Sequence, residues 1–126
     1  MKKLEEKPFD IKHRSYIFAV EVINLIRGFP RETASFVVSK QLVRSATSIG
    51  ANLVESQASS SRKEFANFVR IALKSANETK FWLQLSADTN LSDSGKSKEL
   101  LEEVIEIAKI LGRISVSSRT ETKTND

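Results

Sequence analysis

The 126-residue chain suits a single domain with a substantial core, because 40% of its residues are hydrophobic and 29% are charged. The absence of cysteine excludes disulfides and thiolate metal sites, and four glycines and two prolines are too few for the turns of an all-β fold. The net charge is +4, but bases dominate residues 27–80 and acids dominate residues 88–106. This asymmetry is compatible with nucleic-acid contact, with self-association between unlike surfaces, or with ordinary solvated helix faces.

The first two helices are predicted over residues 10–27 and 31–57. Asp10 is a suitable N-cap, apolar residues recur at helical spacing after it, and Gly28 is a natural stop. Phe29 and Pro30 then turn the chain into the second helix. The predicted core stripe of that helix is Leu42, Ala46, Ile49 and Leu53.

The next two helices follow a run of three serines, residues 59–61, which predicts a turn. Ser61 and Glu64 fit a capping box, so a third helix is expected from Ser61 to about Ala87. A loop over residues 89–97 and a fourth helix over residues 98–115 complete the prediction. The apolar positions of the fourth helix extend beyond one stripe, which is typical of a helix that is deeply buried or covered by another chain. We favour a subunit interface as the explanation.

The predicted fold is an all-α, antiparallel up-down-up-down four-helix bundle, because short connections make sequential helices antiparallel neighbours. The bundle domain is assigned to residues 1–115, and residues 116–126 are predicted to form a disordered polar tail. The first ten residues lack the apolar segment of a signal peptide, and no apolar run approaches the ~20 residues of a membrane span. We therefore expect a soluble protein without membrane contact.

A ladder of polar residues follows one side of the second helix at steps of 4, 3, 4 and 3: Gln41, Ser45, Ser48, Asn52 and Glu55. A ladder beside a core face indicates a polar seam between helices or a surface that meets a partner. If the second and third helices are antiparallel about the serine turn, Arg44 lies near Glu78, and we predict an ion pair between them. The predicted seam consists of Arg44, Ser48, Asn52, Glu55, Ser75 and Glu78.

The seam has two possible roles. As a structural element it would fix the register of the two helices more than it adds stability, because burying charge is costly. The functional alternative is a pair of carboxylates, Glu55 and Glu78, for acid–base chemistry.

Catalytic patterns are lacking in this sequence. His13 is the only histidine, no Glu-x-x-His pair of a di-iron bundle occurs, and no serine belongs to a recognisable nucleophile arrangement. The tripeptide GKS at residues 95–97 lacks the upstream glycine of a phosphate-binding loop. We expect no enzymatic activity, no metal and no cofactor.

Four segments together resemble the 23S rRNA intervening-sequence protein family, also called four helix bundle proteins: FP at residues 29–30, QLVRSATSIGANLVE at 41–55, SRKEFANF at 61–68 and ALKSANE at 72–78. The resemblance covers about residues 9–114. The chain departs from the family pattern at Ser56, where a glycine is usual. The resemblance implies a bacterial, cytoplasmic four-helix bundle that assembles into a homopentameric ring, and it suggests RNA or DNA binding. A related bundle works with a reverse transcriptase in diversity-generating retroelements.

The leading hypothesis is a non-enzymatic oligomer that binds nucleic acid through basic helix faces. The residues expected to contact phosphates are Arg31, Lys40, Arg62, Lys63, Arg70, Lys74 and Lys80. The alternative is a scaffold that receives another protein, such as a polymerase, through the apolar face of the fourth helix and through Phe81 and Trp82.

Overall fold

Four α-helices make up the described part of the chain: α1 (Ile11–Ile26), α2 (Thr33–Ser56), α3 (Arg62–Asp88) and α4 (Ser94–Asn125). The computed structural model describes the backbone of residues 10–125 and the side chains of residues 10–117. No strand occurs within these limits, so the predicted all-α class with four helices is confirmed. Residues 1–9 of the predicted domain and residue 126 of the predicted tail lie outside the described residues.

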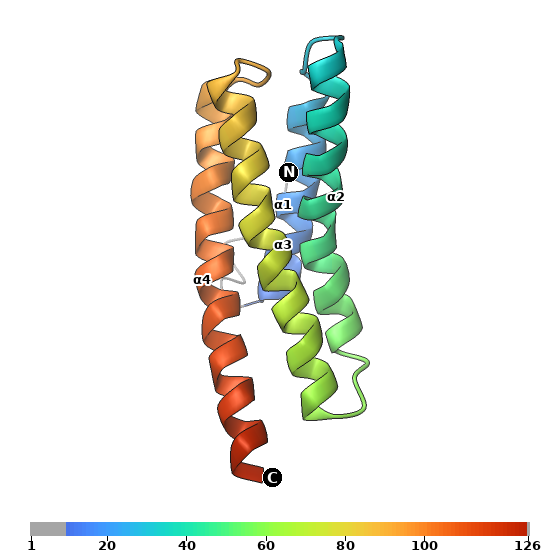
Figure 1. Ribbon diagram of the computed structural model, residues 1–126, viewed down its shortest axis with the longest axis vertical. Coiled ribbons are helices and arrows are strands. Elements are labelled where there is room, and N and C mark those ends of the chain that lie inside the picture. The colour runs from blue at the N-terminus through green and yellow to red at the C-terminus, as the bar shows by residue number, and fades with distance from the viewer. Residues whose placement is uncertain (1–9, 126) are drawn as a thin grey trace.

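The helices lie side by side in a bundle, in which α1 packs on α2 and α4, and α3 packs on α2 and α4 (Figure 1). Hydrogen bonds between α2 and α3 join Ser48 to Ser75 and Ser45 to Thr79. Between these two bonds the residue number falls from 48 to 45 on α2 and rises from 75 to 79 on α3, so these two helices run in opposite directions. In the described residues no helix has an apolar stretch long enough to cross a membrane.

The N-termini of α1 and α3 carry the predicted caps. The Asp10 carboxylate accepts a hydrogen bond from the His13 backbone N–H at 3.0 Å. At α3, Ser61 Oγ accepts from the Glu64 N–H at 3.0 Å, and the Glu64 carboxylate accepts from the Ser60 N–H at 2.8 Å. These contacts satisfy N–H groups that a helix start leaves without an intrahelical partner, which is why the two helices begin at these residues.

The start of α4 differs from the prediction. The helix begins at Ser94 rather than Lys98, so the loop is shorter than residues 89–97. The reason is an N-terminal cap formed by Asp93. The Asp93 carboxylate accepts a hydrogen bond from the Lys96 N–H at 2.8 Å, and Asn90 makes the preceding turn with a left-handed φ of 60°.

The end of α4 also differs from the prediction. The helix continues to Asn125, so residues 116–125, predicted to be a disordered tail, are helical. Neither proline nor glycine follows Gly112 to stop the helix. An apolar stripe is not required for a backbone to continue as a helix, which is why its absence from the sequence of this segment did not predict the helix end.

The core lies along the axis of the bundle and draws on all four helices. Its α2 members are the predicted stripe, and small residues of α2 and α3 let these helices approach closely: Ala46, Ala72 and Ala76 are each completely buried. The apolar surplus of α4 is covered mainly by the chain itself, since Leu100, Val104, Ile107, Ala108 and Leu111 are at most 5% exposed. Within the chain, α1 and α3 cover these buried positions of α4, and a subunit interface on this helix stays a prediction. Among the described residues, large exposed apolar side chains occur mostly on α1, α2 and α3.

Candidate functional site

A polar seam joins α2 to α3. Ser48 and Asn52 are one turn apart on α2, and Asn52 Nδ2 donates to the Ser48 carbonyl oxygen at 2.8 Å. Ser75 of α3 donates from its hydroxyl to Ser48 Oγ at 2.9 Å. One turn further along, the Thr79 hydroxyl lies 2.9 Å from Ser45 Oγ and 2.7 Å from the Ser75 carbonyl oxygen. These bonds satisfy hydroxyl groups that are buried or half-buried between two helices.

The outer edge of the seam is an ion pair. The predicted contact between Arg44 and Glu78 is confirmed, and the Gln41 side-chain oxygen accepts a hydrogen bond from Arg44 Nε at 2.9 Å. Trp82 completes the group, because its Nε1–H donates to the Glu78 carboxylate at 2.9 Å. The Trp82 hydrogen bond, reinforced by the Arg44 charge and opposed by partial burial, holds the pKa of Glu78 below its usual value.

The seam contains two residues that were not predicted, and one predicted member makes no contact within the described residues. Thr79 and Trp82 each follow a seam residue of α3 by four positions, Ser75 and Glu78, and this spacing was the available signal. Glu55 is exposed, and its side chain has neither a hydrogen bond nor an ion pair within the described part of the chain. The contacts therefore end at Asn52, and Glu55 and Glu78 are not partners in the seam.

The seam offers hydroxyl groups without a base beside them. His13, the one histidine, lies at the start of α1. Over the residues whose side chains are described, no group of three or more His, Cys, Asp or Glu residues could hold a metal ion. The arrangement shown is that of a hydrogen-bonded contact between helices.

Replacing Glu78 with glutamine is expected to lower the free energy of unfolding by about 0.2–1 kcal/mol at pH 7, since the pair is partly exposed. Because the pKa of Glu78 is lowered by folding, its contribution is present above the unfolded-state pKa and is lost as the pH falls through the folded-state pKa. The difference between variant and wild type should therefore shrink from pH 7 to pH 3 in urea unfolding experiments.

Glu55→Gln is the matched control, because this carboxylate is exposed and takes no part in the seam. It should leave stability unchanged at both pH values. A Glu78→Gln difference that stays the same at pH 3 would show that the contact does not depend on the carboxylate charge.

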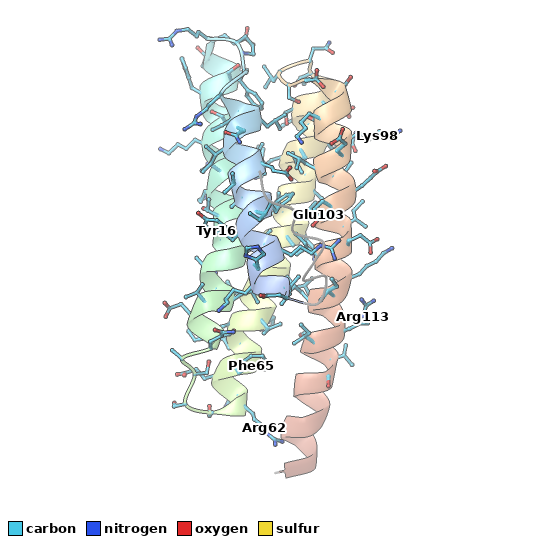
Figure 2. The ribbon with its side chains drawn as sticks, turned by 180° about the vertical axis from the view of Figure 1, so that it is seen from behind. Tyr16, Arg62, Phe65, Lys98, Glu103 and Arg113 are labelled. Atoms are coloured by element: carbon cyan, nitrogen blue, oxygen red, sulfur yellow. The ribbon has the colours of Figure 1, made fainter. Side chains whose placement is uncertain are left out.

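The predicted phosphate-binding residues do not form one surface. Arg31 lies in the connection before α2 and Arg62 begins α3, so about 36 Å of helix separates them. Figure 2 shows Arg62 at the end of the bundle where α2 and α3 connect. Lys40 is exposed on α2, and Lys80 is half-buried on α3. The seven bases are therefore spread over several faces and both ends.

Three of these bases share one stripe of α3. Lys63, Arg70 and Lys74 follow one another at steps of seven and four residues, which places them on the same side of a helix. All three are exposed. Arg70 Nη2 donates to the neutral side chain of Asn67 at 2.6 Å, and none of the three pairs with a carboxylate of the described residues.

The motifs that build the seam also identify the chain. Residues 7–113 match the family model described as 23S rRNA-intervening sequence protein. The chain belongs to this family. The match spans α1 to α3 and most of α4, and it confirms the resemblance carried by the α2 and α3 motifs.

A crystal structure from the same group of proteins supports the assignment. It is a protein of unknown function from the S23 ribosomal protein family of Bacteroides thetaiotaomicron, and it is 41% identical to this chain. The alignment covers 83% of this chain and 97% of that one, with a TM-score of 0.77. No curated protein is significantly similar to the chain.

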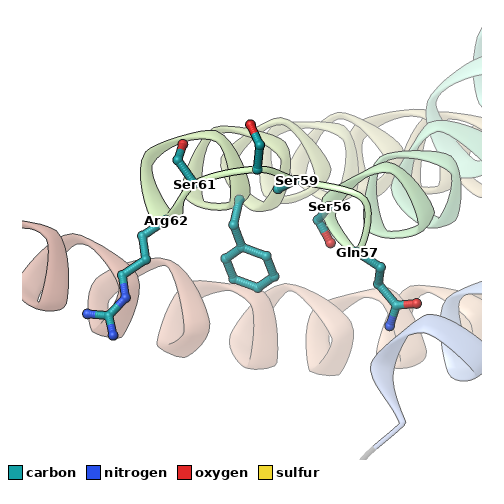
Figure 3. A pocket seen from close by; sticks show the side chains of 7 residues that line it. Ser56, Gln57, Ser59, Ser61 and Arg62 are labelled. Atoms are coloured by element: carbon teal, nitrogen blue, oxygen red, sulfur yellow. The ribbon is translucent and has the colours of Figure 1, made fainter.

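In this member of the family a pocket of about 700 Å³ lies at the α2–α3 connection. Its lining comprises Ser56, Gln57, Ser59, Ser60, Ser61, Arg62 and Phe65. The Ser60 N–H and Ser61 Oγ are already bonded within the capping box. In Figure 3 the Ser61 hydroxyl points away from the side chains of Arg62 and Gln57. The polar groups do not converge, so the pocket lacks the arrangement of an anion site.

A second concavity of this 23S rRNA-intervening sequence protein lies between α1 and α2 and has a volume of about 610 Å³. Its lining is mainly apolar and includes Tyr16, Val20, Ile23 and Val54. Tyr16 is 63% exposed and Val54 55% exposed, and Figure 2 shows Tyr16 on the surface of the bundle. At Gly50 a Cβ would lie 3.8 Å from Ser15, an ordinary van der Waals distance, so the packing of α1 on α2 does not require a glycine there. This groove was not anticipated from the sequence.

Proposed function

We propose that the protein is a non-enzymatic, oligomeric four-helix bundle that binds nucleic acid through basic helix faces. The exposed stripe of Lys63, Arg70 and Lys74 carries this proposal, because no carboxylate of the described residues neutralises it. Basic groups without acidic partners attract phosphates, and counterion release drives such binding. The family name links the chain to 23S rRNA, so structured RNA is the first ligand to test.

The proposal includes the topology and the assembly. We place the helices in an antiparallel up-down-up-down arrangement, which the opposed α2 and α3 and the short connections support. We further propose a homopentameric ring in the bacterial cytoplasm. Exposed apolar residues on α1 and α2, such as Tyr16 and Val54, favour self-association. Soluble monomers rarely expose a large contiguous apolar patch.

Binding to a structured RNA and to duplex DNA across a salt series tests the proposal. We expect the logarithm of the association constant to fall linearly with the logarithm of the salt concentration, because phosphate contacts release counterions. Light scattering on the same sample reports the number of subunits. Absence of binding to both nucleic acids at about 50 mM salt, where such contacts are strong, would refute the proposed function.

A second candidate function is a protein-interaction scaffold, such as an accessory subunit of a reverse transcriptase. The α1–α2 groove favours it, as does Phe81, which is 59% exposed and packs edge-on against Trp82 with ring centroids 4.9 Å apart. The ultraviolet spectrum of the purified protein separates the candidates. Excess absorbance at 260 nm that disappears in high salt favours nucleic-acid binding, whereas a spectrum of protein alone favours the scaffold.

A further inference from the structure

Basic residues of α4 extend the stripe of α3. The connection between Asp88 and Ser94 is short, and α3 and α4 lie side by side along the bundle (Figure 1). Counting residues away from this connection, backward along α3 and forward along α4, places Lys74 at the level of Lys109. Four residues further along each helix, Arg70 lies at the level of Arg113. All of these side chains are exposed.

We define the α3–α4 basic face by five residues: Lys63, Arg70, Lys74, Lys109 and Arg113. Glu106, which lies 3.4 Å from Lys109, is the carboxylate that pairs with a member of this face among the described residues. The nearby Glu103 is occupied by Arg14 of α1, at 2.7 Å. Among the five bases of this surface, only Lys109 therefore forms an ion pair within the described residues.

This concentration of charge does not serve the fold. Like charges at neighbouring positions repel one another and lower stability. Elsewhere the bundle places bases beside acids, as in the pairs of Arg14 with Glu103 and Lys96 with Glu21. In the basic face only Lys109 has such a partner among the described residues, and Lys63, Arg70, Lys74 and Arg113 have none. An external polyanion would supply the missing negative charge.

The α3 stripe of the basic face has one exposed aromatic residue, which is too few to stack successive bases. Phe65 and Phe68, the aromatic residues of α3 near its start, are half-buried. Phe81 is exposed and lies seven residues beyond Lys74 on the same side of α3, so one aromatic ring ends the stripe toward the α3–α4 connection. Proteins that hold single strands combine a positive groove with aromatic side chains on which bases stack. Contacts to phosphates alone carry no direct sequence information.

We infer that the α3–α4 basic face binds the backbone of a nucleic-acid duplex, through its phosphates and without reading the bases. The inference rests on the proposed function and adds the binding face, the residues Lys109 and Arg113, and the duplex form of the ligand. From Lys63 to Lys74 the face extends about 16 Å along α3, which spans several phosphates of a duplex.

The test compares two double variants that each remove two positive charges from exposed positions. Arg70→Gln/Arg113→Gln alters the basic face, and it leaves no carboxylate unpaired because neither arginine forms an ion pair within the described residues. Arg27→Gln/Lys98→Gln is the matched control at exposed positions outside the basic face. The probes are a 20-base-pair RNA duplex and either of its strands, measured from about 50 to 200 mM salt, the range over which phosphate contacts weaken markedly.

We expect Arg70→Gln/Arg113→Gln to bind the duplex at least about tenfold more weakly than wild type and to reduce the salt slope by about 2. The control should keep the wild-type slope, and wild type should prefer the duplex to the single strand. Equal losses in both double variants, or none in Arg70→Gln/Arg113→Gln, would refute the face while nucleic-acid binding stands. Tighter binding of the single strand would refute the duplex. Failure of wild type to bind any probe would overturn the proposed function itself.

Discussion

Replacing Leu42 with alanine is expected to lower the free energy of unfolding by about 2–5 kcal/mol. Leu42 is completely buried within a core to which all four helices contribute. The substitution removes buried methyl groups and leaves a cavity that well-packed neighbours fill only in part. Urea denaturation followed by circular dichroism measures the change.

Val37→Ala provides the control for this prediction. Val37 lies on the same helix and is 55% exposed, so its replacement should change stability by no more than about 0.5 kcal/mol. Similar effects at positions 37 and 42 would mean that the buried stripe of α2 does not face the core as the structure places it.

Replacing Ala76 with leucine is expected to destabilise the bundle by about 1–3 kcal/mol, through overpacking. Ala76 is completely buried on α3, which packs against both α2 and α4. A larger side chain must push one neighbour away and would also strain the seam contacts of Ser75 and Thr79, which flank it on the same helix. Thermal and urea unfolding report the loss.

Asn77→Leu introduces the same side chain one position later, where the native residue is exposed. It should alter stability by no more than about 0.5 kcal/mol. If Ala76→Leu is tolerated as well as Asn77→Leu, the close approach of α3 to its neighbours is wrong.

The motif residues of α2 and α3 include the residues that build the polar seam. The motif residues that carry the resemblance include Arg44, Ser48, Ser75 and Glu78, which join α2 to α3, and Asn52, which bonds to Ser48 within α2. A hydrogen-bonded seam penalises slippage of one helix along the other, because a shift leaves half-buried polar groups without partners. These seam residues therefore serve helix register. Of the bases proposed to contact a ligand, Lys63 and Lys74 lie within the same motif segments, and Arg70, Lys109 and Arg113 lie outside them.

Much of the secondary structure could be predicted because its causes are local. Asp10 and Ser61 cap helices through side chains that reach only three residues ahead, and the α2 stripe follows the helical period. The ion pair of Arg44 and Glu78 could be predicted too, since a short serine turn leaves little freedom in the register of α2 on α3. The Asp93 cap of α4 also acts over only three residues, but it was not predicted because the neighbouring residues are equally typical of a loop.

The sequence by itself determined the all-α class, the number of helices, most of their boundaries and the family. Only the tertiary structure decided which neighbour covers each helix. It showed that α4 buries its apolar positions within the chain, that an apolar groove opens between α1 and α2, and that bases of α3 and α4 lie at matching levels. Helical periodicity and capping depend on residues a few positions apart, whereas the rotation of one helix against another depends on packing between distant segments.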